Sequence, residues 1–554
     1  MPHTVSTDLD MKLRELLYGE GTEFDRNKRC LPQTRLSFLD AIIQWINDPD
    51  TSSPRVLALF GQAGTGKSSI AHEIAHRYSR INRLTTSYFF VRDNPSGREP
   101  YRFFTTLARD LCKICPAFKV ALGKIIDEKP EIAHVRNYTM LIEALLRDPV
   151  KDLYFVGPIV IVIDALDEND DAAYKRLYAG GNSISFQTAL LQCVSNLPSN
   201  FRILITSRPE KYLLDAIPES SSVRHMYMND ERLGKEIDND IFIYTDTRLG
   251  GAGVSESDVK KLAKKAEGLF QWVSVACDYV LHPPRGLNSK LCIQRVLNPT
   301  TGNRGLNPLD ILYTTVLERF DINDPDIHDN FQSAMGHILG SFAPLSVDSL
   351  NMMSRFDSST DDFRDVSDIV KDLGSLLSHV TPTESTLPIA PLHTSFRDFL
   401  TDKTRSGNFY VNLDDVHVKF ASATLRTMQA KLQFNICKLE TSYHLNSEVK
   451  DLKQRIEDNI PHALSYSSRF WADHVARVFE FNSEVFEALR NFMKERFLFW
   501  LELLSVRGEV RIARPSLLSL QVWLAHINDR VRFFYSFGCL MTKLLRWKMK
   551  KWMA

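Results

Sequence analysis

The chain has 554 residues, a length for three to four domains at roughly 150 residues each. Lys and Arg together number 68, and so do Asp and Glu, so the formal net charge is zero. This balance argues against a dedicated nucleic-acid coat or a polybasic membrane binder, because both depend on excess positive charge. The eight cysteines are sparse, which is typical of a reducing compartment.

Residues 1–50 predict a leader helix and an entry helix. The start of the chain has no apolar core of a secretory signal, and the longest apolar run, residues 155–163, is too short to span a bilayer. We therefore expect a soluble, cytoplasmic protein without a membrane or nucleic-acid partner. The basic, aromatic tail at 537–554 leaves an interfacial amphipathic helix as an alternative.

Residues 51–232 alternate apolar, strand-like runs with helical patterns. The strand-like runs are 56–60, 87–91, 159–163, 202–206 and a weaker one at 223–228. Strands that alternate with helices predict a parallel, doubly wound sheet, and near-continuous apolar strands predict that both of its faces are covered. The expected fold class is therefore α/β, with three αβα layers.

The segment GQAGTGKS at 61–68 matches the phosphate-loop pattern G-x-x-x-x-G-K-[ST] in full, between a strand-like run and an amphipathic helix. Glycines let consecutive N–H groups surround phosphate oxygens, and the helix N-terminus adds its positive end. Lys67 is expected to reach the β- and γ-phosphates, and Ser68 to hold Mg²⁺. The expected nucleotide-binding residues are Gly61, Gly64, Thr65, Gly66, Lys67, Ser68 and Ser69.

A second motif, IVIVIDALDE at 159–168, ends a strand-like run in Asp164. An acid at the carboxyl end of a buried strand beside a phosphate loop is the Walker B arrangement, so Asp164 is the second expected Mg²⁺ ligand. Glu168 is the first candidate for orienting or deprotonating the attacking water, and Asp167 the second. Alternatively, these two acids cap the next helix.

A third motif is the strand-like run that ends in Thr-Ser-Arg at 206–208. Arg208 would lie beside the γ-phosphate and sense nucleotide state, or it is a surface arginine paired with a loop acid. The sequence contains no N-K-x-D motif of the kind with which GTPases read their base. ATP and ADP are therefore the favoured nucleotides.

After residue 232 the pattern becomes mostly helical. We expect a helical domain at 233–325 and a second helical domain at 413–554. The domain between them, at 326–412, should contain short helices and a strand-like stretch at 388–392. These segments contain no sustained repeat of solenoid or propeller period.

The three motifs, GQAGTGKSSIA, IVIDALDE and ILITSRPE, resemble those of the NACHT class of STAND P-loop ATPases. The similarity is greatest to a large fungal group whose nucleotide domain is described as nephrocystin-like. It continues through the entry loop CLPQTR at 30–35, where relatives often have Gly in place of Gln33, and through AEGLFQWVSVA, LDILYTTVL and LHTSFRDFL. The resemblance implies a NACHT core at 51–232 and a winged-helix domain at 326–412. We expect the C-terminal WD40 repeats common in such relatives to be missing.

The resemblance also implies a mechanism. LHTSFRDFL is similar to a winged-helix motif in which a histidine contacts the β-phosphate of ADP, which implies this role for His393; a helix-start or core histidine is the alternative. The implied function is an ATP/ADP-gated signalling switch with slow ATP hydrolysis that controls self-assembly, or assembly with other NACHT proteins. An idle scaffold and a remodelling ATPase are the alternatives.

Overall fold

The computed structural model divides into two compact units, Met1–Thr315 and Val316–Ala554. The predicted basic tail lies outside the part of the chain that the structure describes. The described residues are 9–10, 12–13, 15–91, 95–151, 153–169, 171, 184–229, 234–283, 286–299, 307–357, 365–378, 387–441 and 444–530.

The first unit contains a five-stranded sheet in which every pair of neighbours is parallel. Its spatial order is β2-β3-β4-β1-β5. The strands are β1 (Val56–Phe60), β2 (Leu84–Phe89), β3 (Ile159–Asp164), β4 (Phe201–Ser207) and β5 (Val223–Tyr227). The predicted parallel α/β sheet is confirmed. Because β4 lies between β1 and β3, the segment after β4 emerges between the segments that follow those two strands.

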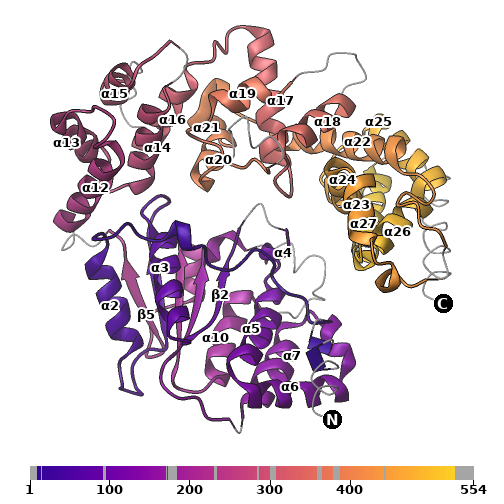
Figure 1. The fold of residues 1–554 in the computed structure, drawn as a ribbon, viewed down its shortest axis with the longest axis horizontal. Helices are drawn as coiled ribbons and strands as arrows, with labels where there is room; N and C mark the ends of the chain where they lie inside the picture. Colours follow the sequence, from indigo (N-terminus) through magenta and orange to yellow (C-terminus); the bar gives the residue numbers. More distant parts are fainter. Residues whose placement is uncertain are drawn as a thin grey trace. The chain divides into compact units, whose positions relative to one another are not determined.

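Helices flank this sheet (Figure 1). Ile161 and Ile163 share one core with residues of the helices that follow β2 and β3. Val160 and Val162 are equally buried and point to the opposite face, where β3 contacts α3. Both faces are therefore covered, as the apolar strands predict. The helices are α2 (Leu36–Ile46), α3 (Lys67–Arg80), α4 (Pro95–Arg98), α5 (Tyr101–Ile114), α6 (Pro116–Glu128), α7 (Tyr138–Ile142), α8 (Asp148–Val150), α10 (Phe186–Asn196) and α11 (Lys211–Ala216).

The segment before α2 packs against β2 and belongs to the core of the sheet. Leu16 is fully buried in the same cluster as the β3 side chains. The backbone carbonyl of Thr22 accepts a hydrogen bond from the N–H of Phe89, at 2.9 Å. A Cβ on Gly19 would lie 2.6 Å from the ring of Tyr88, so only glycine permits this close approach. The N-terminal segment is thus a structural part of the sheet domain.

Five helices follow β5 among the described residues of the first unit. Trp272 of α14 is buried, and its indole Nε1 donates to the carbonyl of Pro308 at 3.1 Å, which ties α14 to α16. The helices are α12 (Gly234–Leu249), α13 (Glu256–Lys265), α14 (Phe270–Leu281), α15 (Ser289–Leu297) and α16 (Pro308–Leu317), whose last two residues fall in the second unit.

The second unit is helical around a core that contains the fully buried Trp471 and Trp500. The predicted strand-like stretch at 388–392 forms only isolated antiparallel bridges, Leu345 with Ile389 and Leu377 with Pro391, so a winged helix stays a prediction. No helix in the described parts of either unit is long and apolar enough to cross a membrane. The helices are α17 (Pro325–Gly340), α18 (Val347–Asp357), α19 (Ser367–Asp372), α20 (Thr394–Leu400), α21 (Lys403–Ser406), α22 (Leu413–Lys431), α23 (Leu452–Asn459), α24 (His462–Val475), α25 (Ser483–Asn491), α26 (Phe497–Val506) and α27 (Ala513–Arg530).

Replacing Leu16 with Ala should destabilise the sheet, although residue 16 lies far from it in sequence. We expect a loss of about 2–5 kcal/mol, the usual cost of a buried Leu→Ala change. Hydrogen exchange of the β2 and β3 amides in the full chain measures this loss. The exposed neighbour provides the control, since Glu15→Ala should change the same amides by less than about 0.5 kcal/mol. Equal exchange in the two variants would show that the segment is not part of the core.

Candidate phosphate-binding site

The segment 61–68 runs from the end of β1 to the start of α3. Gly64 and Gly66 have φ angles of +81° and +90°, in the left-handed region that glycine adopts without strain. Gly66 is the N-cap of α3. Because glycine has no side chain, the first N–H groups of this helix receive no hydrogen bond from a capping side chain. Such a helix start suits an anion. The local backbone therefore has the properties that the phosphate-loop pattern predicts.

Lys67 turns its ammonium back onto the loop. Its Nζ donates to the carbonyl of Gly61 at 2.7 Å and to that of Gln62 at 2.9 Å. Burial lowers the pKa of Lys67, and the negative charges of Asp167 and Asp164 oppose this shift. The lysine therefore lies within electrostatic reach of both predicted acids.

Asp164 is a buried carboxylate, only 4% exposed, at the end of β3. It accepts a hydrogen bond from the hydroxyl of Thr206. Burial raises the pKa of Asp164, while the hydroxyls of Thr206 and Ser68 and the charge of Lys67 oppose the rise. The structure thus brings together the two predicted metal ligands. A hydroxyl and a carboxylate are oxygen donors, which fit the preference of Mg²⁺.

Thr206 is a member of this site that the sequence analysis did not assign. It is fully buried, and its hydroxyl donates to Asp164 while accepting the N–H of Ala165 at 3.1 Å. Ala165 has a φ of +54°, so the chain turns sharply directly after the strand. In the sequence, Thr206 stands out only as a polar residue at the end of an apolar strand. Its pairing with Asp164 can be inferred only once the order of the strands is known.

Asp167 pairs with Arg208. The Nε of Arg208 lies 3.2 Å from Oδ2 of Asp167, and Oδ1 accepts the Arg208 N–H and the Ser207 hydroxyl, both at 3.1 Å. The Asp167 side chain is only 7% exposed. The predicted alternative, an arginine paired with a loop acid, describes this contact, but the acid belongs to the site. Asp167 therefore holds Arg208 in place, and the role of either acid in orienting a water molecule stays a prediction.

Glu168 lies in a 3₁₀ turn, Leu166–Glu168, that directly follows Asp164 and Ala165. Burial lowers the pKa of Lys67, the charge of Arg208 adds to this shift, and the charge of Glu168 opposes it. The ends of β1, β3 and β4 therefore bring Lys67, Ser68, Asp164, Asp167, Glu168 and Arg208 together. Ser69 follows in α3 and carries no distinguishing contact.

His393 belongs to the second unit, where it is the N-cap of α20. Its Nδ1 accepts the N–H of Ser395 at 3.1 Å and lies 2.7 Å from the Ser395 hydroxyl. This local role corresponds to the helix-start alternative. A contact between His393 and a nucleotide stays a prediction.

Arg35 is a second residue to which the sequence analysis gave no role. It has a left-handed backbone, with a φ of +60°, and is only 3% exposed. Its guanidinium Nη2 donates to the carbonyl of Thr65 in the phosphate loop. Its backbone N–H donates to Oδ2 of Asp240 on α12 at 2.9 Å. The entry-loop resemblance at 30–35 was the only signal, and it does not reveal a partner more than 200 residues away.

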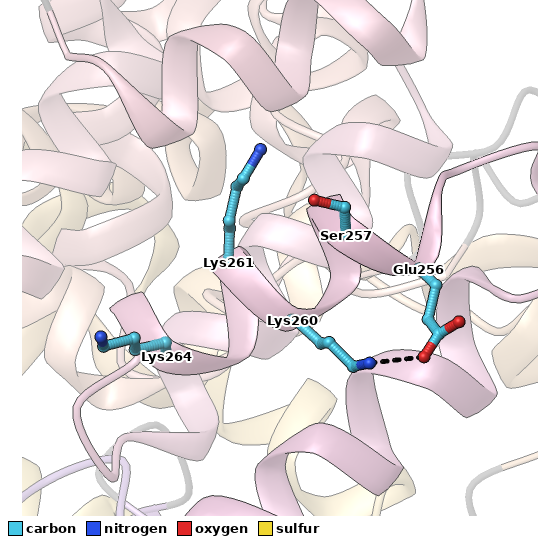
Figure 2. Close-up of a pocket in the computed structure, with 5 residues that line it drawn as sticks. All are labelled: Glu256, Ser257, Lys260, Lys261 and Lys264. Carbon is cyan, nitrogen blue, oxygen red and sulfur yellow. Dashed lines mark hydrogen bonds and ion pairs between the residues drawn. The ribbon is translucent and has the colours of Figure 1, made fainter.

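An open hollow on the surface of α13 is distinct from this site. Figure 2 shows that all of its lining residues come from one helix: Glu256, Ser257, Lys260, Lys261 and Lys264. Lys260 pairs with Glu256 at 2.6 Å. The hollow contains none of the predicted site residues, and a row of solvated lysines on a helix explains it.

Comparison with known protein families supports the expected nephrocystin-like domain. Residues 35–208 match the family model described as "Nephrocystin 3, N-terminal". This span includes the phosphate loop, Asp164 and Arg208, and it supports a nephrocystin-like N-terminal domain in this part of the chain. A search of curated proteins gives no match.

The buried carboxylate predicts a pH dependence of stability. Because burial raises the pKa of folded Asp164 above the ordinary value of 3.8, the folded state holds this proton more tightly than the unfolded state does. Stability from this group is present at low pH and is lost as the pH rises through the raised pKa. The Tm advantage of Asp164→Asn over the wild type, both free of nucleotide, should therefore grow from pH 4 to pH 7.

Thermal unfolding of the full chain across this pH range measures the effect. The matched control is Asp215→Asn in α11, an exposed aspartate of the same unit, which should show no such trend. An advantage of Asp164→Asn that shrinks as the pH rises would contradict the assignment.

Proposed function

We propose that this protein is a nucleotide-binding switch that binds ATP and ADP at the 61–68 loop. The supporting observation is the convergence of Lys67, Ser68 and Asp164 at the edge where β1, β3 and β4 end. A cation, a helix start and a buried acid in this arrangement suit a polyphosphate and its metal. The match to a nephrocystin-like domain over the same residues also favours this function.

Ser68 and Asp164 would hold Mg²⁺ on this proposal. When bound, the metal neutralises phosphate charge and orients the phosphate groups. Thr206 keeps the Asp164 carboxylate in one orientation by donating to it. Lys67 already lies over the loop and would exchange its contacts with Gly61 and Gln62 for phosphate oxygens.

Hydrolysis would depend on two groups beside the phosphate loop. Glu168 would orient the attacking water and accept its proton. Arg208, held by Asp167 at 3.2 Å, would donate to the γ-phosphate and respond to its loss. Catalysis of this kind rests on positioning and charge stabilisation.

A switch also needs two states that contact the nucleotide differently, because only differential contacts shift an equilibrium. By resemblance to NACHT proteins, His393 would contact ADP in a closed state, and exchange for ATP would open the chain for self-assembly. Hydrolysis would reset it. An idle scaffold that assembles with full-length relatives is the alternative, and it would not turn over nucleotide.

Lys67→Ala should weaken nucleotide binding roughly 10- to 100-fold, because charge-assisted hydrogen bonds contribute about 1.5–3 kcal/mol. The nucleotide content of the purified full chain and its affinity for ADP are the measurements. Lys264→Ala, at an exposed lysine of α13, should leave both unchanged. Equal retention of nucleotide by Lys67→Ala and the wild type would reject the proposal.

Glu168→Gln should lower ATP turnover by about 10²–10⁴-fold, the range for loss of a general base, and should still bind Mg²⁺-ATP. Size-exclusion chromatography should then show the ATP-bound assembly accumulating, whereas ADP should give the monomer. Asp167→Asn is the matched comparison, and it should lower turnover less because it only loosens Arg208. If Glu168→Gln changes neither turnover nor assembly, the scaffold alternative is favoured.

A further inference from the structure

Arg35 lies where the phosphate loop meets the helices that follow the sheet. Its guanidinium donates to the Thr65 carbonyl, and its Cζ lies 4.4 Å from the centre of the Phe270 ring at the start of α14. Its backbone N–H donates to Asp240 on α12. One buried residue therefore contacts the loop and both helices.

A second contact joins the same elements. The N–H of Gln271, in the first turn of α14, donates to the carbonyl of Gly64 at 3.0 Å. A Cβ on Gly64 would lie 2.6 Å from Cβ of Gln271, so the helix and the loop are in close contact. In a loop whose N–H groups face a phosphate, the carbonyls face away and need other donors. Arg35 and Gln271 supply such donors to two consecutive loop carbonyls.

Several arginines of the described residues, among them Arg55, leave one buried guanidinium nitrogen without a hydrogen bond, and Arg35 does so beside the phosphate loop. Its Nη1 is buried and has no hydrogen-bond partner within the described residues. A buried donor without an acceptor costs free energy. A loop conformation that places an acceptor beside Nη1 would remove this cost and would therefore be favoured. The free-energy cost of burying Arg35 thus depends on the conformation of the loop.

We propose that Arg35 is a positioning residue that couples the phosphate site to α12 and α14. The proposal rests on nucleotide binding at the loop. Nucleotide orders the loop, and this changes the acceptors that Thr65 and Gly64 offer to Arg35 and Gln271. The change reaches α12 through Asp240 and α14 through Phe270. The coupling is reciprocal. If nucleotide changes the affinity of a partner for α12 or α14 by some factor, that partner changes the affinity for nucleotide by the same factor.

Substitution of Arg35 tests this coupling through ADP affinity, measured by calorimetry on the full chain. Arg35→Met should bind ADP about tenfold more weakly or worse, as loss of a charged hydrogen bond implies. Arg35→Lys should be intermediate, because an ammonium reaches one carbonyl but cannot stack as a planar group on Phe270. If Arg35→Met binds ADP as tightly as the wild type does, the coupling is overturned.

Arg55 provides the matched control. It also places its guanidinium on backbone carbonyls, those of Val194 and Leu197, but it precedes β1 at the end opposite to the loop. Arg55→Met should lower the Tm and leave ADP affinity within twofold of the wild type. An equal loss of ADP affinity in Arg55→Met and Arg35→Met would show a general stability effect and overturn the inference.

Hydrogen exchange on the wild type tests the same coupling without any substitution. ADP should slow exchange of the Gln271 amide several-fold and leave α15 unchanged. Bound ADP with no change at Gln271 would reject the coupling and leave the proposed function standing. Failure of the wild type to bind ADP at all would reject the proposed function itself.

Discussion

A buried carboxylate at the end of β3 is the constraint on which the rest of the site depends. Asp164 is almost entirely removed from water, so its charge must be balanced by groups that the fold brings to it. Thr206 donates to it, the Ser68 hydroxyl lies nearby, and Lys67 adds a positive charge. These groups come from the ends of three elements, and they meet only because β4 lies between β1 and β3. The strand order therefore determines which side chains meet at this site.

The two acids after Asp164 occupy different positions in the structure. Asp167 accepts three polar contacts, all from Ser207 and Arg208, which hold the arginine in one place. Glu168 ends the following 3₁₀ turn. On the proposed function, these two adjacent carboxylates would serve as an anchor and a base. On the proposed function, the anchor determines the position of Arg208 and the base determines the rate.

The sequence predicts the framework of the sheet well and its polar contacts poorly. The apolar runs at β1, β3 and β4 are continuous, so their positions agree with prediction to within one residue at each end. β2 begins three residues earlier than predicted because Thr85 and Thr86 are polar, and the Thr86 hydroxyl is satisfied by Asp110 at 2.6 Å. The motif residues around Lys67 could be named from local spacing alone. Thr206 and Arg35 could not, because their partners are adjacent only in the folded chain.

The N-terminal segment and β5 both pack on the sheet, so a recombinant fragment of this domain needs to include them. The matched span starts at Arg35 and ends at Arg208, so it excludes Leu16 and the whole of β5. A recombinant fragment with those limits would uncover the Tyr88 side of the sheet and leave β1 as an open edge. Unpaired strand edges promote aggregation. The matched span is therefore shorter than the unit that packs around this sheet, which also includes the N-terminal segment and β5.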